Sequence, residues 1–467
     1  MRARGRTLRG RSRGSPGRPD PTARPLLKTT DHGDPLEVRA HAIGASGERW
    51  VEPFLQANAP SMQRLRLQVD VCADSEVYVR LTPGARIGAM PLVGPATRRV
   101  VAGILVEPRF RWPALGAVFN SIGFTVEPAL GGSPLVPGSA RDVPPWILAG
   151  PVIQRVAALL RHSRRSFVEH QETRSSPRGR VLWPTWISTQ LPRGAWTQFP
   201  CRYSEPESDP DLLANARWTL SRLMEELSRV AWSPPGRFLL RRADELLLAI
   251  GPGRALRPGV QPAVPAASEW LRDAVEAMAW VAEERGLGGA RSLDGLAWDL
   301  SVDSVWEAWI AAFAGRLGGR LGMIASPFEG ARRVLRWVGP VQSMGSLAPD
   351  VELRGAERVV WIDAKYKPHL QLLAHRGWSG VSEEVRREHR ADLHQALAYA
   401  SLADVAQVDT LLLYPSMGSE PRRLDTVATV TSGRRRVRLI LASVPFGYRS
   451  PEHEETDLAA FRELLVG

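Results

Sequence analysis

Residues 349–366 read PDVELRGAERVVWIDAKY, in which two short apolar runs flank a polar turn. β-Branched and aromatic residues dominate the second run, and the Gly-containing tetrapeptide between the runs has the composition of a turn, so the pattern predicts a β-hairpin. Side chains alternate along a strand, which puts Asp363 and Lys365 on the same face. When the second strand folds back on the first, Asp350 comes close to Asp363.

These three charged residues are the types that metal-dependent phosphodiester hydrolysis needs. Two neighbouring carboxylates repel each other unless a cation lies between them, and oxygen ligands with an open coordination sphere suit Mg²⁺, for which Mn²⁺ can substitute. Lys365 would orient the attacking water and stabilise the charge that develops at phosphorus. With Pro349 ahead of Asp350, the hairpin resembles the PD-(D/E)xK motif of metal-dependent nucleases.

A predicted helix precedes this hairpin and offers a further carboxylate. Residues 301–317 carry apolar side chains at a helical spacing, with Glu307 as the acid in mid-helix. Asp303 lies in the first turn, where the helix dipole alone explains an acidic residue. Nucleases of this class often take a third acidic ligand from such a helix, so Glu307 is a candidate metal ligand.

A second predicted helix follows the hairpin at residues 383–403. Gln395 and Tyr399 are four residues apart in it and therefore share a face. An amide cannot take a proton at neutral pH, so Gln395 is expected to orient Lys365 or a phosphate rather than to act as a base. The apolar residues 410–415 then predict a buried strand.

Each of these features also has an ordinary structural explanation. A Pro-Asp pair often begins a turn, an Asp-x-Lys triplet occurs by chance in most chains of this length, and Glu307 can be a solvated helix residue. The ordered combination is much rarer, and charged side chains in an apolar strand are costly unless they are paired or bind a metal. We therefore predict an active site whose metal ligands are Asp350, Asp363, the Ala364 carbonyl and Glu307, with Lys365 and Gln395 as catalytic residues and Pro349, Tyr366 and Tyr399 beside them.

Six segments carry a more specific resemblance. They are 177–182 (PRGRVL), 199–205 (FPCRYSE), 215–220 (NARWTL), 362–367 (IDAKYK), 392–400 (DLHQALAYA) and 412–415 (LLYP). Over about residues 155–445 the chain resembles the McrC family, the nuclease subunits of McrBC-type modified-cytosine restriction systems. In that family the third of these segments has an Asn that opens a long helix.

The resemblance implies a DNA endonuclease subunit that cuts double-stranded DNA together with an AAA+ GTPase or ATPase motor of the McrB kind, in restriction or anti-phage defence. Residues 1–150 match no part of the family, so the recognised base or sequence does not transfer. Two alternatives stay open. One is a non-catalytic adaptor that activates an AAA+ ring and holds DNA, against which the intact Asp-x-Lys argues. The other is a repair or transposon-type nuclease with the same core.

The amino-acid composition says less about the function than the motifs do. A net charge of +12 and a pI near 10.6 favour a polyanionic partner. Much of this charge comes from arginines before residue 25, which are equally explained by a nucleic-acid-binding tail and by a misassigned start codon. Cys72 and Cys201 predict buried free thiols in the cytoplasm. No apolar run suffices to span a membrane, and without a P-loop pattern the chain is not expected to hydrolyse nucleotides.

The pattern along the chain predicts a multidomain α/β protein. We expect a disordered basic tail (1–27), a mostly β N-terminal domain for recognition or partner docking (28–145), a helical central region (146–290), and a C-terminal restriction-endonuclease-like α/β domain with a central mixed sheet (291–467). Alternating apolar positions predict strands at 65–71, 77–81 and 100–106 of the second part.

Overall fold

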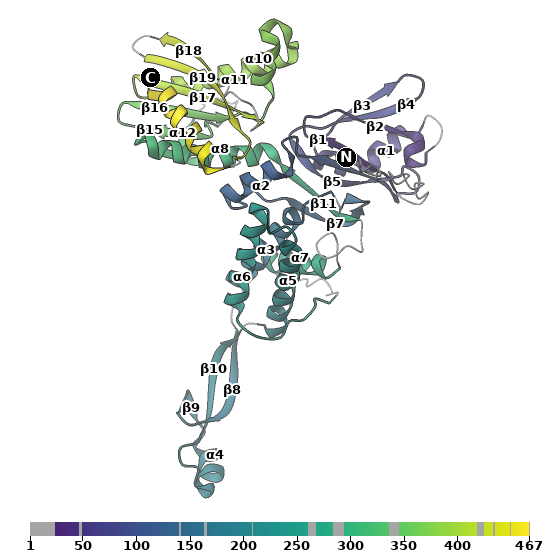
Figure 1. Ribbon diagram of the computed structural model, residues 1–467. Coiled ribbons are helices and arrows are strands. Elements are labelled where there is room, and N and C mark those ends of the chain that lie inside the picture. The colour runs from purple at the N-terminus through teal and green to yellow at the C-terminus, as the bar shows by residue number, and fades with distance from the viewer. Residues whose placement is uncertain are drawn as a thin grey trace, which may run out of the picture.

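The structure is a computed structural model that describes residues 24–45, 49–139, 142–162, 166–207, 209–259, 268–283, 294–335, 345–417, 425–432, 435–448 and 450–466. The chain is α/β with mixed sheets. Figure 1 shows an N-terminal and a C-terminal sheet unit side by side, a helical bundle beneath them, and a narrow arm that projects from the bundle. Within the described ranges, no helix combines the length and apolar character needed to cross a membrane.

The N-terminal unit combines two sheets with two helices. Its elements are β1 (Leu26–Thr30), β2 (Leu36–Arg39), η1 (Ala40–Ile43), α1 (Val51–Arg64), β3 (Gln68–Ala73), β4 (Val77–Thr82), β5 (Arg86–Val93), β6 (Val100–Glu107), α2 (Arg111–Ile122), β7 (Ala129–Val136) and β11 (Gly295–Ser301). One sheet has the order β1-β6-β5-β11-β7 and the other the order β2-β4-β3. The strands predicted at 77–81 and 100–106 are confirmed as β4 and β6, whereas the strand predicted at 65–71 begins only at Gln68.

The first described strand begins inside the predicted tail. Residues 1–23 of that tail lie outside the described ranges, but Leu26 and Leu27 belong to β1 and pair in parallel with Gly103 and Ile104 of β6. Both leucines pack against the main hydrophobic core. Two adjacent apolar residues at the edge of the arginine-rich stretch are enough to add a strand.

The helical bundle consists of α3 (Pro145–His162), α5 (Pro210–Ser228), α6 (Pro234–Ile250) and α7 (Glu269–Ala282). The side chain of Asp209 accepts hydrogen bonds from two first-turn amides of α5 and so fixes the start of this helix. Asn215, expected to open the helix, instead lies inside α5 and is buried. The cap and Pro210 already satisfy the geometry of the first turn.

The arm interrupts the region that the sequence predicts as helical. It contains β8 (Ser166–Arg174), β9 (Arg180–Val181), α4 (Trp183–Thr185), the helical turns η3 (Trp186–Gln190) and η4 (Leu191–Arg193), and β10 (Phe199–Glu207). Strand β10 pairs antiparallel with both β8 and β9. The arm was not predicted because its strands show no regular alternation of apolar and polar residues.

The C-terminal unit is built on a six-stranded mixed sheet with the order β12-β15-β16-β17-β19-β18. Strands β16, β17 and β19 run parallel and their outer neighbours antiparallel. The elements are α8 (Val302–Leu321), β12 (Ile324–Pro327), α9 (Phe328–Ala331), β13 (Arg333–Val334), β14 (Ser346–Leu347), β15 (Val351–Arg354), β16 (Arg358–Ala364), α10 (His369–Gly380), α11 (Glu383–Ser401), β17 (Gln407–Ser416), β18 (Asp425–Ser432), β19 (Arg435–Pro445) and α12 (Pro451–Val466). The predicted hairpin, both predicted helices and the strand at 410–415 are confirmed.

The alternation of β16 assigns its two faces to different helices. Val360 and Ile362 belong to the core cluster that contains the apolar side of α8, whereas Val359 and Trp361 pack in a cluster with Tyr399 of α11. Asp363 and Lys365 follow on the same side as Val359 and Trp361. The two charged residues therefore face α11.

Strand β11 joins the two sheet units. It lies between β5 and β7 in the N-terminal sheet, and α8 of the C-terminal unit starts at the next residue. Ser301 ends the strand and also caps α8, because its side chain accepts a hydrogen bond from Ser304 N. The sequence predicts a domain boundary at residue 291. That boundary would separate β11 from the N-terminal sheet to which it is hydrogen-bonded, so the C-terminal unit begins at α8 instead.

Candidate active site

The hairpin brings the two predicted aspartates together. Val351 pairs with Ile362 across β15 and β16, so Asp350, just before β15, lies beside Asp363. The Ala364 backbone N–H donates a hydrogen bond of 2.6 Å to Asp350 Oδ2. Pro349 is buried at the entry to β15. The sequence spacing thus places both carboxylates and the Ala364 backbone at one end of the sheet.

Burial and mutual repulsion disfavour two negative charges at this point. Burial and the nearby Asp363 carboxylate raise the pKa of Asp350 to about 7, against the hydrogen bond from Ala364. Burial also raises the pKa of Asp363, although the Lys365 ammonium opposes that shift. A metal ion between the carboxylates would relieve this unfavourable arrangement.

The donor set fits a hard divalent cation. Asp363 is 4% exposed, and its Oδ2 accepts no hydrogen bond in the part of the chain that the structure describes. That oxygen lies 2.5 Å from the ammonium of Lys365, with which it forms an ion pair. Carboxylate and carbonyl oxygens are the ligands that Mg²⁺ and Mn²⁺ prefer. Asp350, Asp363 and Ala364 therefore suit such an ion.

Lys365 is held from two sides. Its Nζ pairs with Asp363 and donates a hydrogen bond of 2.9 Å to Gln395 Oε1 of α11. The Gln395 amide in turn donates to the Tyr399 hydroxyl at 2.5 Å. Burial opposes the charged form of Lys365, but the carboxylates around it, Asp363 foremost, raise its pKa above the ordinary value. The amine is therefore a charged hydrogen-bond donor at neutral pH.

Glu307 approaches from α8, on the other side of the sheet. Its side chain is exposed, yet desolvation by the surrounding protein, then the charges of Asp303 and Asp363, raise its pKa. The carboxyl group thus lies close enough to the aspartates to sense their charge.

Tyr366 points away from the carboxylates, toward the N-terminal unit. Its hydroxyl donates a hydrogen bond of 2.7 Å to Oδ2 of the fully buried Asp31. The Arg109 amide donates to the other oxygen of Asp31 at 2.6 Å, and the Arg109 guanidinium lies over the Tyr366 ring at 4.4 Å. We call Asp31, Arg109 and Tyr366 the junction, because they connect the N-terminal unit to the residue that follows Lys365.

An open recess of about 460 Å³ lies beside Lys365, between the two sheet units. Its lining includes His32 of the N-terminal unit, Lys367 and His369, and Glu388 of α11. Lys367 Nζ lies 3.1 Å from Asp392 Oδ1 and 3.4 Å from Glu388 Oε2. None of these residues was predicted as part of a site.

Lysine usage is the signal that would have identified Lys367. The chain has 61 lysines and arginines, of which only Lys28, Lys365 and Lys367 are lysines. Arginine therefore supplies positive charge almost everywhere else in this chain. A compact ammonium with three rotatable donors differs from a planar guanidinium. Two of the three lysines lie at this end of β16, which indicates a local need for that group.

Comparison with known proteins gives similarity to McrBC assemblies. Neither a protein-family model nor a curated protein sequence matches the chain. The chain is similar to one in the structure of Thermococcus gammatolerans McrB AAA+ hexamers with bound McrC, at 15% identity and a TM-score of 0.44, over 94% of this chain and 100% of that chain. The cryo-EM structure of the Thermococcus gammatolerans McrBC complex gives 15% identity and a TM-score of 0.25, over 62% and 88%.

Proposed function

We propose that the chain is the metal-dependent DNA endonuclease subunit of a McrBC-like restriction or defence system. The observation that carries this proposal is the group formed by Asp350, Asp363 and Lys365, with Gln395 holding the lysine. Close carboxylates beside a charged, doubly held lysine are what the hydrolysis of a phosphodiester needs. A binding module has no use for this combination.

Each side chain has a role in this proposal. Asp350, Asp363, the Ala364 carbonyl and Glu307 would hold Mg²⁺ or Mn²⁺, which when bound supplies Lewis-acid stabilisation of charge at the phosphate. Lys365 donates hydrogen bonds to the attacking water or to a phosphate oxygen, and its raised pKa favours this role over that of a general base. Gln395 fixes the direction of the Lys365 side chain. Water then attacks phosphorus in line with the leaving oxygen and loses its proton to solvent, while the P–O bond to the leaving oxygen breaks and that oxygen takes up a proton from solvent.

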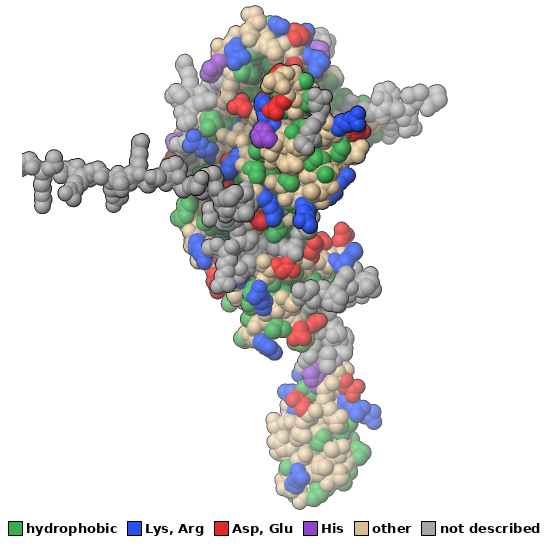
Figure 2. Space-filling view, turned by 90° about the vertical axis from the view of Figure 1, so that its right-hand side faces the viewer, with side chains coloured by type: hydrophobic (Ala, Val, Ile, Leu, Met, Phe, Trp, Pro, Cys, Tyr) green, Lys and Arg blue, Asp and Glu red, His purple; other side chains and the backbone are tan. Residues whose placement is uncertain are grey.

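The arm is our candidate surface for an AAA+ motor partner. Figure 1 shows it projecting from the bundle, and Figure 2 shows hydrophobic side chains on its surface. Near its tip Trp183, Ile187 and Trp196 are exposed by 54%, 56% and 67%. Apolar side chains gathered on a projecting element mark a surface that binds another protein. The motor itself is proposed from the sequence resemblance to McrC.

Restriction of phage or plasmid DNA tests the catalytic proposal, in cells that carry the whole gene neighbourhood and hence any motor. Wild type is compared with Lys365→Ala at matched protein levels. Lys28→Ala is the matched control, because the exposed Lys28 pairs with Asp142 and not with a carboxylate of the site. We expect wild type and Lys28→Ala to restrict and Lys365→Ala to lose restriction.

A second assay separates the competing functions. Purified wild type and Asp363→Asn are titrated with Mn²⁺ and followed by electron paramagnetic resonance. Lost restriction in Lys365→Ala together with Mn²⁺ binding that depends on Asp363 supports the nuclease. Equal restriction by wild type and Lys365→Ala would instead make the chain an adaptor whose neighbour performs the chemistry. Cleavage without any motor gene favours the repair or transposon-type nuclease.

A further inference from the structure

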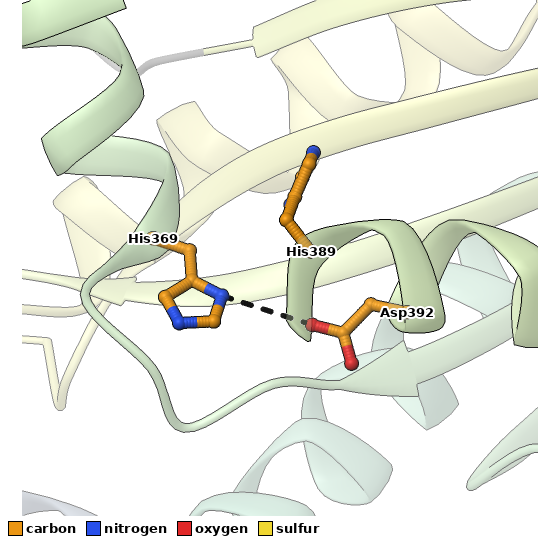
Figure 3. A group of neighbouring side chains, drawn as sticks. All are labelled: His369, His389 and Asp392. Atoms are coloured by element: carbon orange, nitrogen blue, oxygen red, sulfur yellow. Dashed lines mark ion pairs between the residues drawn. The ribbon is translucent and has the colours of Figure 1, made fainter. Parts of the chain in front are cut away.

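A second group of side chains with the donor atoms of a metal site lies next to the predicted carboxylate site. His369 is the first residue of α10, and His389 and Asp392 lie one turn apart on α11, so they share a face of that helix. Figure 3 shows the His369 ring directed at the Asp392 carboxylate, with His389 beside it. One nitrogen of each ring and one carboxylate oxygen lie within 4.8 Å of one another.

All three side chains are buried, between 4% and 5% exposed. His369 Nδ1 has no hydrogen-bond partner among the residues that the structure describes, and it lies 3.9 Å from Asp392 Oδ2. A buried ring nitrogen without a partner is costly, because it loses its hydrogen bond to water and gains none. The nitrogen is therefore directed at a position where a ligand would compensate it.

The groups behind the histidines are those that usually orient metal ligands. Glu388 Oε2 lies 3.5 Å from His369 Nε2, the ring nitrogen opposite the unpartnered one. The Tyr414 hydroxyl lies 3.5 Å from His389 Nδ1 and so holds that ring from the β17 side. A histidine bound to a metal nearly always donates its other N–H to a carboxylate or another oxygen, which fixes the ring.

The donor set differs from that of the carboxylate site. Two imidazoles and one carboxylate suit a borderline ion such as Zn²⁺, with one position open, whereas Mg²⁺ prefers oxygen ligands alone. Ligands about 2.1 Å from a tetrahedral ion lie about 3.4 Å apart, so donor atoms that now lie within 4.8 Å of one another must move closer to hold an ion. We propose that His369, His389 and Asp392 form a second metal site that binds Zn²⁺ or a similar borderline divalent ion, beside the active site, where Asp392 Oδ1 lies 3.7 Å from Lys365 Nζ.

Lys367 competes with the ion in this arrangement. Its Nζ lies 3.1 Å and 3.2 Å from the two oxygens of Asp392, so the ammonium neutralises the carboxylate when no metal is bound. The side chain of Lys367 is 30% exposed and lines the recess, into which it can swing. Binding of the ion therefore releases Lys367 toward the recess beside Lys365. Removing the ammonium should strengthen metal binding.

The test uses the full chain, stripped with a chelator and titrated with Co²⁺ in excess Mg²⁺. Co²⁺ replaces Zn²⁺ and gives visible d–d bands when nitrogen ligands bind it in tetrahedral geometry. Wild type should bind a single equivalent, and Zn²⁺ should displace it. His369→Ala should weaken binding at least about tenfold, and Glu388→Gln by a smaller factor. Lys367→Met should bind more tightly than wild type.

Two controls make the outcome decisive. His375→Ala removes an exposed histidine of α10 and should bind like wild type. Asp363→Asn disables the carboxylate site and should also keep the Co²⁺ bands. Absence of these bands in both wild type and Lys367→Met would overturn the proposal. So would bands that survive His369→Ala but vanish in Asp363→Asn, because the ion would then occupy the carboxylate site.

Discussion

At the scale of single residues, the aspartate pair predicts how metal binding depends on pH. The pKa of Asp350 is raised from 3.8 to about 7, so below this pH a metal must displace a proton. We expect Mn²⁺ affinity to fall by up to about tenfold for each pH unit below 7 and to level off above it. Calorimetric titration at several pH values measures this, and a pH-independent affinity would contradict it.

The same shift predicts a change in folding stability without metal. Between pH 3.8 and about 7 the folded chain holds a proton on Asp350 that the unfolded chain has lost. The free energy of unfolding should therefore decrease as the pH rises through this window. Asp350→Asn should flatten the decrease and be more stable than wild type above neutral pH. Urea unfolding in the presence of a chelator tests the sign.

We expect Gln395 to affect the rate of DNA cleavage and not the affinity for the metal ion. Without its amide, Lys365 keeps its pairing with Asp363 but loses the hydrogen bond that directs it. We expect Gln395→Ala to lower cleavage by roughly 10–100-fold while Mn²⁺ affinity stays unchanged. Leu397→Ala, an exposed change on the same helix, is the matched control. A parallel loss of Mn²⁺ binding would mean that Gln395 supports the ligands instead.

For single residues, the sequence predicted which side chains lie close together only where they belong to one short segment. Asp350, Asp363 and Lys365 are connected by a hairpin with fixed alternation, so their proximity follows from strand geometry alone. The partners of Tyr366 and Lys367 could not be predicted in this way. Asp31 lies 335 residues from Tyr366, and Asp392 lies 25 residues from Lys367 on another element. Only tertiary packing brings them together.

At the scale of elements, the arm depends on one glycine. Gly179 has φ +64°, and a Cβ at this position would lie 2.5 Å from Tyr203 Cβ and 2.6 Å from Arg202 O of β10. Gly179→Ala should destabilise the arm by clearly more than the cost of about 1–2 kcal/mol that a left-handed backbone imposes on any side chain. Hydrogen exchange in residues 166–207 measures this loss.

Gly194 provides the control for that experiment. It has φ +69°, but its added Cβ would meet only Trp196 Nε1, at 3.7 Å. Gly194→Ala should therefore cost about 1 kcal/mol and leave β8 and β10 protected. Equal exchange in the two variants would show that the contact with Tyr203 is not what restricts position 179.

Some helices and strands could be predicted from their own residues, and others could not. Strands β16 and β17 and helix α8 were predicted because long apolar runs or a helical period mark them. Strand β8 was missed because its residues are mostly polar, and its structure comes from pairing with β10. Helices α1 and α2 were not predicted, because the strands around them alternate apolar and polar residues and the whole region was therefore expected to be mostly β. The local sequence pattern cannot predict a strand that is stabilised only by pairing with a strand elsewhere in the chain.

At the scale of the whole molecule, the junction should contribute strongly to stability. Asp31→Ala leaves the Arg109 guanidinium and the Tyr366 hydroxyl without their buried acceptor. Removing one partner from a buried charged group costs about 3–5 kcal/mol. Urea unfolding should show this loss. Glu76→Ala, which breaks a surface pair with Arg39, should cost at most about 1 kcal/mol. Comparable losses in the two variants would rule out a special role for the junction.

The arm tip predicts a change in assembly without a change in the active site. Trp183→Ser with Trp196→Ser removes two exposed apolar side chains and should weaken co-purification with the proposed AAA+ motor and lower restriction. Mn²⁺ binding by the purified variant should equal that of wild type. Trp232→Ser, an equally exposed tryptophan outside the arm, is the control. Unchanged co-purification of the double variant would exclude the tip as the docking surface.

The position of β11 constrains how the chain is made. Ribosomes deliver residues in order, and the inner strand between β5 and β7 is Gly295–Ser301 of a 467-residue chain. Until that strand emerges, the growing polypeptide exposes the unpaired edge and apolar face of a sheet whose other strands were translated long before. Such an edge invites pairing with other chains. Nascent-chain chaperones should therefore engage this protein during translation until the strand emerges.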